Sequence, residues 1–217
     1  MEEPKDSQGI LAEVSRLLAL SKKLGALKFG EFTLTSGKSS SYYFDGRVIT
    51  LNPEGSCCVA RAILGLIEGK EIEAVAGPAV AGVPIVAAVA AMSYINGQSV
   101  QGLVVRKETK GHGAGRLIEG RVRTGARVAV VDDTCSTGGS ILSAIKALEG
   151  VGCQVVMAIC ILDRQMGGGV EIEKRGHKFV SLLKASEEGI IDKQIARGDI
   201  SPLDFIQVEN ISRSKIF

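Results

Sequence analysis

A pair of adjacent carboxylates, Asp132 and Asp133, stands between a short apolar run and a loop of small polar residues. The apolar run, residues 128–131, is typical of a strand that is buried on both faces. Residues 134–140 read TCSTGGS and combine hydroxyl groups with glycines that let backbone N–H groups converge. Because a helical pattern begins at Ile141, this segment predicts a phosphate site at a helix N-terminus. We call residues 134–140 the phosphate loop.

The acidic pair restricts what this site can bind, because two carboxylates repel a bare anion. Ionised carboxylates only accept hydrogen bonds, so the cis-diol of a ribose is one partner that reconciles them with a phosphate. A Mg²⁺ ion chelated by sugar hydroxyls and a pyrophosphate is a second, compatible answer. No lysine follows the glycines as it does in a Walker loop, which favours a monophosphate over a triphosphate. The pattern indicates a ribose phosphate ligand.

A second polar segment, residues 106–123, separates two predicted strands and is punctuated by glycines. A loop with this charge, placed opposite a diol-phosphate site, can close over a polyanion. It would then stabilise a departing pyrophosphate and exclude water. A solvated surface loop is the alternative interpretation. The potential cations of the segment are Arg106, Lys107, Lys110, His112 and Arg116.

The elements that must position these groups alternate along the chain. Apolar runs predict strands at residues 73–76, 100–105, 128–131, 155–162 and 179–183. Helical periodicity predicts helices at 10–24, from 53 to about 68, 84–95, from 141 onward, and 187–196. This alternation indicates an α/β fold in which a mainly parallel sheet is flanked by helices. Ligands of such folds bind beyond the carboxyl ends of the strands, where the acidic pair and the cationic segment fall.

Composition and charge narrow the class of protein. A chain of 217 residues with 45% hydrophobic and 23% charged residues suits one soluble domain. The net charge of +2 is too small to indicate a nucleic-acid partner. The longest apolar stretch, residues 74–95, is interrupted by glycines and prolines, so we expect a strand, a turn and a helix instead of a membrane span.

The five cysteines and the polar N-terminus favour a cytoplasmic location. The cysteine number is odd, no spacing resembles a zinc pair, and the first nine residues do not resemble a signal peptide. We therefore expect buried, reduced thiols. Cys135 lies within the phosphate loop, but no histidine lies near it in the sequence, which argues against a nucleophilic role.

The run VVDDTCSTGGS resembles the 5-phosphoribosyl 1-diphosphate (PRPP) signature of type I phosphoribosyltransferases. Three further segments are similar to the orotate phosphoribosyltransferases of that family. RKETKGHG resembles their mobile catalytic loop, FGEFTLTSGKSSSYYFDGR their N-terminal hood, and LDR at residues 162–164 their base-recognition strand end. The resemblance implies a single type I phosphoribosyltransferase domain over 1–217, with a twisted, mainly parallel sheet. Its small hood would be formed mainly by about 10–50, and its PRPP core by about 51–185.

The resemblance also implies a reaction, the transfer of ribose 5-phosphate from PRPP to orotate. The products are orotidine 5′-monophosphate and pyrophosphate, and the step belongs to pyrimidine (UMP) biosynthesis. Asp132 and Asp133 would take the ribose hydroxyls and, indirectly through PRPP, the Mg²⁺ cofactor. With Lys110, the candidate for the key cation, they form the implied catalytic set. The other residues implied for PRPP and pyrophosphate are Arg106, Lys107, His112, Thr134, Cys135, Ser136, Thr137, Gly138, Gly139 and Ser140.

Orotate recognition would fall to Tyr43, Phe44, Ser136 and Arg164. An arginine suits this role because its planar guanidinium pairs with a carboxylate or with carbonyl groups. The family further implies a homodimer in which the mobile loop completes the neighbouring active site. Thr35 and Ala81 depart from the family pattern, since many members have lysines at these places.

The sequence leaves two alternative functions open. One is a type I transferase for a purine base, against which the loop histidine and Arg164 argue. The other is a non-catalytic, PRPP-binding regulator built on the same fold. Such a regulator would carry a DNA-binding element, and residues 1–24 are too short for a helix-turn-helix domain.

Overall fold

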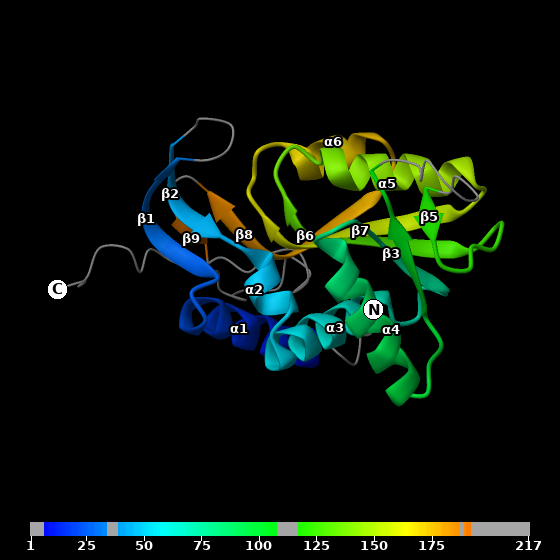
Figure 1. Cartoon of the computed structure of the whole chain (residues 1–217), viewed down its shortest axis with the longest axis horizontal. Helices are drawn as coiled ribbons and strands as arrows, with labels where there is room; N and C mark the ends of the chain where they lie inside the picture. The colour runs from blue at the N-terminus through cyan, green and yellow to red at the C-terminus, as the bar shows by residue number, and fades with distance from the viewer. Residues whose placement is uncertain (1–6, 34–38, 108–116, 187–188, 192–217) are drawn as a thin grey trace.

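The computed structural model describes residues 7–33, 39–107, 117–186 and 189–191. Their strands form two sheets (Figure 1). The smaller sheet is an antiparallel hairpin of β1 (Leu27–Thr33) and β2 (Ser39–Phe44). The larger sheet has seven strands in the order β5-β4-β3-β6-β7-β8-β9.

Five central strands of the large sheet run parallel, as the alternation of elements predicts. The two edge strands, β5 and β9, are antiparallel to their neighbours. Strand order reverses between β3 and β6, because the chain goes from β3 outward to β4 and then returns to the other side of β3. The strands are β3 (Ala74–Pro78), β4 (Gln101–Val105), β5 (Ile118–Glu119), β6 (Arg127–Cys135), β7 (Gln154–Asp163), β8 (Lys178–Ser186) and β9 (Gly189–Ile191).

Helices cover both faces of this sheet (Figure 1). On one face lie α1 (Ser7–Lys23), α2 (Gly46–Thr50), α3 (Pro53–Ile67) and α4 (Gly82–Ile95), and on the other α5 (Gly139–Gly150) and α6 (Gly168–Lys174). The apolar run of β6 serves both layers because successive side chains of a strand point to opposite faces. Val128 and Val130 belong to the core under α5, whereas Ala129 and Val131 belong to the core under α1, α3 and α4.

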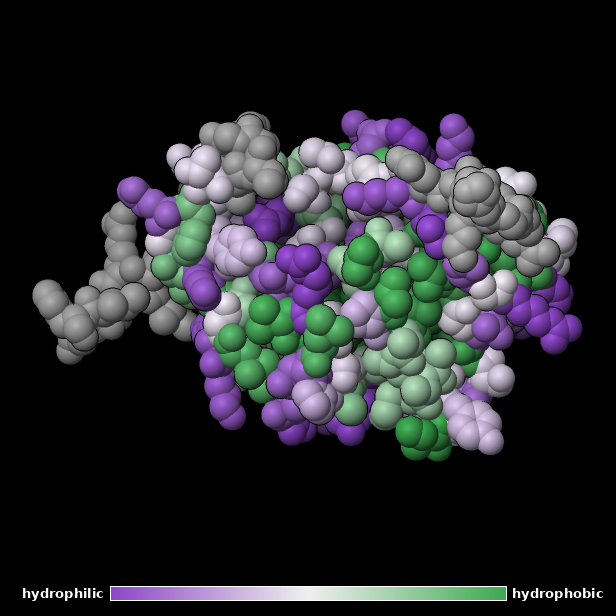
Figure 2. All heavy atoms as spheres, viewed as in Figure 1, coloured by the Kyte–Doolittle hydropathy of each residue, from purple (hydrophilic) through white to green (hydrophobic). Residues whose placement is uncertain are grey.

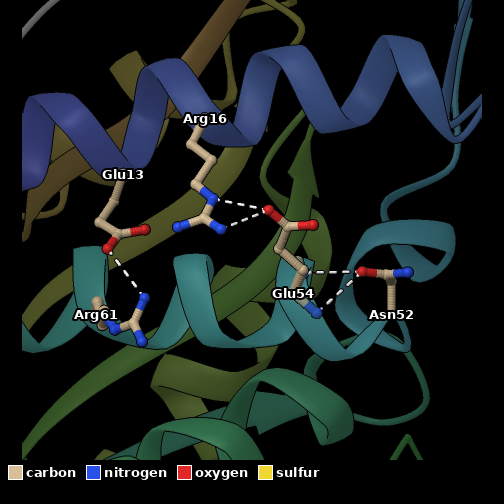
Figure 3. A network of polar contacts seen from close by, with 6 residues as sticks. Glu13, Arg16, Asn52, Glu54 and Arg61 are labelled. Carbon is tan, nitrogen blue, oxygen red and sulfur yellow. Dashed lines mark hydrogen bonds and ion pairs between the residues drawn. The ribbon is translucent and has the colours of Figure 1, made fainter.

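The N-terminal helix α1 is tied to α3 by polar contacts at the surface (Figure 3). Arg16 pairs with Glu54 at 2.6 Å, and Arg61 pairs with Glu13 at 3.2 Å. Asn52 caps α3, because its side-chain oxygen accepts from the backbone N–H groups of Glu54 and Gly55, each at 3.0 Å. This confirms the helix start predicted at residue 53, where the structure places a cap residue before a proline.

The structure confirms the fold class and departs from the predicted elements at three places. Strand β6 continues to Cys135, so the acidic pair lies inside the strand and not after it. Residues 189–191 pair with β8 as an edge strand, so the helix predicted over 187–196 is wrong there; its other residues lie outside the described ones. The short elements α2, β5 and α6 were not predicted. Among the described residues, no helix is both long and apolar enough to cross a membrane.

Candidate functional site

A cleft of about 1790 Å³ opens where the strand order reverses, at the carboxyl ends of β3 and β6. Parallel sheets bind ligands at such a switch point, because the loops that follow the two strands diverge there. The cleft is lined by the hood hairpin, the loop after β3, the end of β4, the end of β6 and the exposed side of α5. It therefore brings together the acidic pair, both ends of the phosphate loop, and Arg106 and Lys107.

The two acids of β6 both line this cleft but lie on opposite sides of the strand. The Asp132 carboxylate faces α5, where it accepts a hydrogen bond from the Ser140 hydroxyl at 2.8 Å and one from the Asp133 backbone N–H at 2.9 Å. Asp133 faces α2, where a Cβ atom built on Gly46 would lie 2.6 Å from the Cβ atom of Asp133. Its carboxylate accepts from the Thr134 hydroxyl at 3.1 Å.

Burial changes the titration of both acids. It raises the pKa of Asp132 to about 7, the Ser140 hydroxyl opposes the rise, and the nearby Asp133 charge adds to it. Burial also raises the pKa of Asp133, which the Thr134 contacts oppose. Only 5% of the surface of Asp132 is exposed. Such a site favours partners that hold the carboxylates ionised, namely hydroxyl donors and cations.

The phosphate loop connects β6 to α5 and is supported from behind by α6. Gly138 adopts a left-handed conformation, with φ of 80°, and is the N-cap of α5. The Ser136 carbonyl accepts from the backbone N–H of Gly168 at 2.9 Å. A Cβ atom on Gly168 would lie 2.5 Å from the Gly138 nitrogen, so only glycine fits there. Thr137, Gly139 and Ser140 are exposed at the surface of the loop.

Cys135, predicted as part of the PRPP site, is the last residue of β6 and is buried. Burial raises the pKa of its thiol to about 12, which keeps the sulfur protonated. The thiol therefore packs in the core behind the loop, and its contribution to a ligand is limited to its backbone. All five cysteines lie in the described part of the chain, and each is free.

The loop after β3 forms the opposite wall of the cleft. Gly77 and Gly82 lie so close that a Cβ atom on either would come within 3 Å of the other's backbone. The Ala79 N–H donates to the Val105 carbonyl at 2.8 Å, and the Ala79–Val80 peptide bond is cis. Ala81, at the place where many family members have a lysine, also lines the cleft.

Two of the five predicted cations lie in the cleft, and the other three, Arg116 among them, lie outside the described residues. Arg106 and Lys107 follow β4 and line the cleft, and Arg106 pairs with Glu119 at 3.3 Å. Lys110 and His112 fall within residues 108–116, which are not described.

Two of the four predicted base-recognition residues lie at the hood side of the cleft, whereas Ser136 and Arg164 are not among its lining residues. Tyr43 and Phe44 of β2 line it, and the Arg164 Nη2 atom donates to the Phe44 carbonyl at 3.3 Å. The Arg164 backbone N–H donates to the Cys135 carbonyl at 2.8 Å, which fixes this residue next to the phosphate loop. Arg164 therefore links the hood to the loop that follows the acidic pair.

The sequence interpretation missed three residues of this region. Arg47 lines the cleft and is held by Asp45 through contacts of 2.9 and 3.0 Å. Gly46 and Gly168 have no side chain, and this allows their backbones to lie close to Asp133 and to the phosphate loop, respectively. The Asp45-Gly46 turn signal was visible in the sequence, but nothing in it indicated that this turn lies against β6.

Comparisons with known proteins agree with this fold and cleft. Residues 50–185 match the family model described as "Phosphoribosyl transferase domain", so the fold and site define a phosphoribosyltransferase. An orotate phosphoribosyltransferase of Aquifex aeolicus is 39% identical over 181 residues, which cover 82% of this chain and 98% of that one. That of Rhodopirellula baltica is 36% identical over 184 residues, covering 82% and 95%. The chain belongs to the orotate phosphoribosyltransferase family.

A solved structure supports the same assignment. The Mycobacterium tuberculosis orotate phosphoribosyltransferase in complex with 5-phospho-alpha-D-ribosyl 1-diphosphate superimposes with a TM-score of 0.67. It is 32% identical and covers 79% of this chain and 96% of that one. An adenine phosphoribosyltransferase of Thermoanaerobacter pseudethanolicus, 21% identical with a TM-score of 0.58, shares the fold.

Proposed function

We propose that the protein transfers ribose 5-phosphate from PRPP to orotate, giving orotidine 5′-monophosphate and pyrophosphate in pyrimidine biosynthesis. The observation that carries the proposal is a single cleft at the strand-order reversal, which is lined by the acidic pair, by both ends of the phosphate loop (Thr134 and Ser140) and by hood side chains. Family membership supports the choice of orotate as the acceptor. The relatives give no support to a purine acceptor or to a non-catalytic regulator.

The roles of the residues follow from charge and geometry. The phosphate loop and the N-terminus of α5 bind the 5′-phosphate through backbone N–H groups and hydroxyls. Asp132 and Asp133 accept hydrogen bonds from the ribose hydroxyls, one from each side of β6. Arg106, Lys107, Lys110 and His112 neutralise the departing pyrophosphate. Catalysis is then mainly electrostatic, because the site stabilises a positive ribosyl centre and a leaving diphosphate that are already oriented.

Mg²⁺ fits this site as a cofactor that the substrate brings. The ion is usually held by one or two carboxylates together with substrate phosphates, in place of a protein cage. Among the described residues no cluster of three metal-ligating side chains occurs, whereas Asp132 and Asp133 both line the cleft. These two acids would hold the ion indirectly, through PRPP. The ion supplies charge neutralisation at the pyrophosphate.

We also propose a cytoplasmic homodimer in which the loop carrying Lys110 completes the neighbouring site. The exposed apolar residues of α2, α4 and their flanks support a second copy as partner; they are Val48, Leu51, Val80, Tyr94 and Ile95. Figure 2 shows apolar side chains gathered over these elements on one face. Clustered exposed apolar side chains are typical of subunit contacts.

Mixed dimers test the shared site. Lys110→Ala and Asp132→Asn proteins are each expected to be inactive, and are then mixed under conditions that exchange subunits. The mixture should recover about one quarter of the wild-type activity, because half of the dimers are mixed and each mixed dimer holds one complete site. No recovery, with subunit exchange verified, would show that the loop acts within its own subunit.

The reaction is tested by following the loss of orotate absorbance with PRPP and Mg²⁺. Adenine and uracil replace orotate in parallel reactions. Turnover of orotate alone is expected. No turnover of orotate at saturating PRPP would refute the proposed function, and turnover of adenine would favour the purine alternative.

A further inference from the structure

Tyr42 precedes the predicted base-recognition residues Tyr43 and Phe44 on β2. Its side chain points to the face of the hairpin opposite to that of Tyr43. Successive residues of a strand point to opposite faces, and here Tyr43 is 38% exposed whereas Tyr42 is 4% exposed. Burial by itself would make Tyr42 an ordinary core residue. Its contact with a charged side chain from another part of the chain indicates a role in the site.

The ring of Tyr42 lies against the guanidinium group of Arg164. The Arg164 Cζ atom is 5.4 Å from the centre of the ring, within the range of a cation–π interaction. The same guanidinium donates to the Phe44 carbonyl on the same strand. Burial raises the pKa of Tyr42, and both the charge of Arg164 and a hydrogen bond between Arg164 and the Tyr42 hydroxyl oppose the rise, in agreement with a close contact. Arg164 is thus held by two residues of β2, one through its face and one through an N–H group.

This contact matters because an arginine side chain has many rotamers. Fixing the guanidinium plane before the substrate arrives removes part of the ordering cost of binding. The planar fork of an arginine pairs with a carboxylate only when the plane is correctly oriented. The hydrogen bond to the Cys135 carbonyl fixes the backbone of Arg164, so the Tyr42 ring restricts the rotamers of the Arg164 side chain.

We propose that Tyr42 is a positioning residue that sets the guanidinium plane of Arg164 for orotate. The proposal rests on the proposed function, in which Arg164 contacts the base. It assigns to Tyr42 a part in acceptor affinity and none in PRPP binding. The ring face makes the main contact with the guanidinium, and the hydroxyl group makes a smaller contribution.

Steady-state kinetics with both substrates test this assignment. Tyr42→Leu is expected to raise the KM for orotate by about 3- to 30-fold, the factor that a cation–π contact corresponds to. The KM for PRPP should stay unchanged, and Tyr42→Phe, which keeps the ring and loses only the hydroxyl, should raise the orotate KM much less than Tyr42→Leu. Phe29→Leu, on the neighbouring strand β1, is the matched control for the loss of an aromatic ring in the hood. An unchanged orotate KM in folded Tyr42→Leu protein, or an equal rise for Tyr42→Phe, would overturn the proposal.

A double-mutant cycle separates this inference from the proposed function. In an Arg164→Ala background, Tyr42→Leu should have no further effect on the orotate KM. If Arg164→Ala raises this KM and Tyr42→Leu raises it equally with and without Arg164, the positioning role is wrong and the role of Arg164 stands. If Arg164→Ala leaves the KM unchanged, both assignments fall. Failure of the wild type to turn over orotate refutes the function itself.

A second series keeps the volume of the ring and so avoids loss of folding. Phenylalanine carrying one, two or three fluorine atoms is incorporated at residue 42, which weakens the negative face of the ring stepwise. The orotate KM should rise with each fluorine, while thermal stability and the PRPP KM remain constant. A flat series would overturn the proposal.

Discussion

The backbone of Gly46 lies directly against the side chain of Asp133. A Cβ atom at residue 46 would stand 2.6 Å from the Asp133 Cβ and 2.9 Å from its Oδ2. The turn that begins α2 therefore touches one member of the acidic pair, and glycine at residue 46 makes this approach possible.

Gly46→Ala should displace Asp133 or lift α2 from β6. We expect kcat/KM to fall by about 10- to 100-fold, because small displacements of a positioned group are costly in catalysis. The free energy of unfolding should fall by about 1–3 kcal/mol, as in other overpacked sites. Steady-state assays and urea unfolding measure the two effects. Gly150→Ala is the control, since an added methyl group there meets nothing within 4 Å. Equal behaviour of both variants would contradict the contact.

Gly168 supports the phosphate loop from outside the cleft. A Cβ atom there would lie 2.6 Å from the Cys135 sulfur and from the Ser136 carbonyl oxygen. Gly168→Ala should therefore push the loop away from α6 and raise the KM for PRPP more than the KM for orotate. Initial-rate kinetics with each substrate varied in turn check the prediction. Equal changes in both constants would indicate a general loss of structure.

The raised pKa of Asp132 predicts how stability depends on pH. The folded protein keeps a proton on Asp132 up to about pH 7, whereas the unfolded chain releases it near the ordinary value of 3.8. Stability without ligands should therefore fall as the pH rises through this window, with a slope of up to about 1.4 kcal/mol per pH unit from this group. Urea unfolding across the window measures it. Asp132→Asn should flatten the curve, and an unchanged slope would exclude Asp132 as the cause.

The hydroxyl of Ser140 opposes this rise in pKa by its hydrogen bond to Asp132. Ser140→Ala should raise the pKa of Asp132 further, by about one unit. A carbon-13 NMR titration of labelled aspartate measures the shift directly. Ser143→Ala, on the exposed side of the same helix, is the matched control and should leave the titration in place.

Asn52 and Arg16 provide a test of which polar contacts in Figure 3 stabilise the fold. Asn52→Ala removes the cap of α3 and should cost about 1 kcal/mol of unfolding free energy. Arg16→Ala removes an exposed ion pair with Glu54 and should cost less than the loss of the cap, with the effect disappearing at high salt. Denaturant unfolding at two salt concentrations distinguishes the two. A larger loss for Arg16→Ala would reverse this ranking.

The strands and helices that form the sheet and its cover were accessible from the sequence because their apolar periods are strong. The same is true of the acidic pair and the phosphate loop, which are contiguous in the chain. The elements that were not predicted are short: α2 and α6 have too few residues to show a helical hydrophobic period, and β5 has only two residues. The end of β6 was also misplaced, since acids usually indicate the end of an apolar strand.

Contacts between distant residues could not be predicted in this way. Arg164 was recognised as a site residue, but its contact with the Tyr42 ring joins residues from β2 and from beyond β7. Gly46 and Gly168 carry no chemistry of their own, so their types predict turns and nothing more. Their importance lies in the space that Asp133 and the phosphate loop occupy, which only the three-dimensional arrangement reveals.

The opposite orientation of Asp132 and Asp133 places each acid under the control of a different hydrophobic layer. Asp132 lies against α5, whose Ile141 belongs to one core, whereas Asp133 lies against α2, whose Ile49 belongs to the other. A cavity made in one layer would shift one carboxylate relative to the other while leaving every ligand-contacting residue unchanged. The spacing of the two acids is thus a property that evolution can adjust from the interior of the protein, without altering the active site itself.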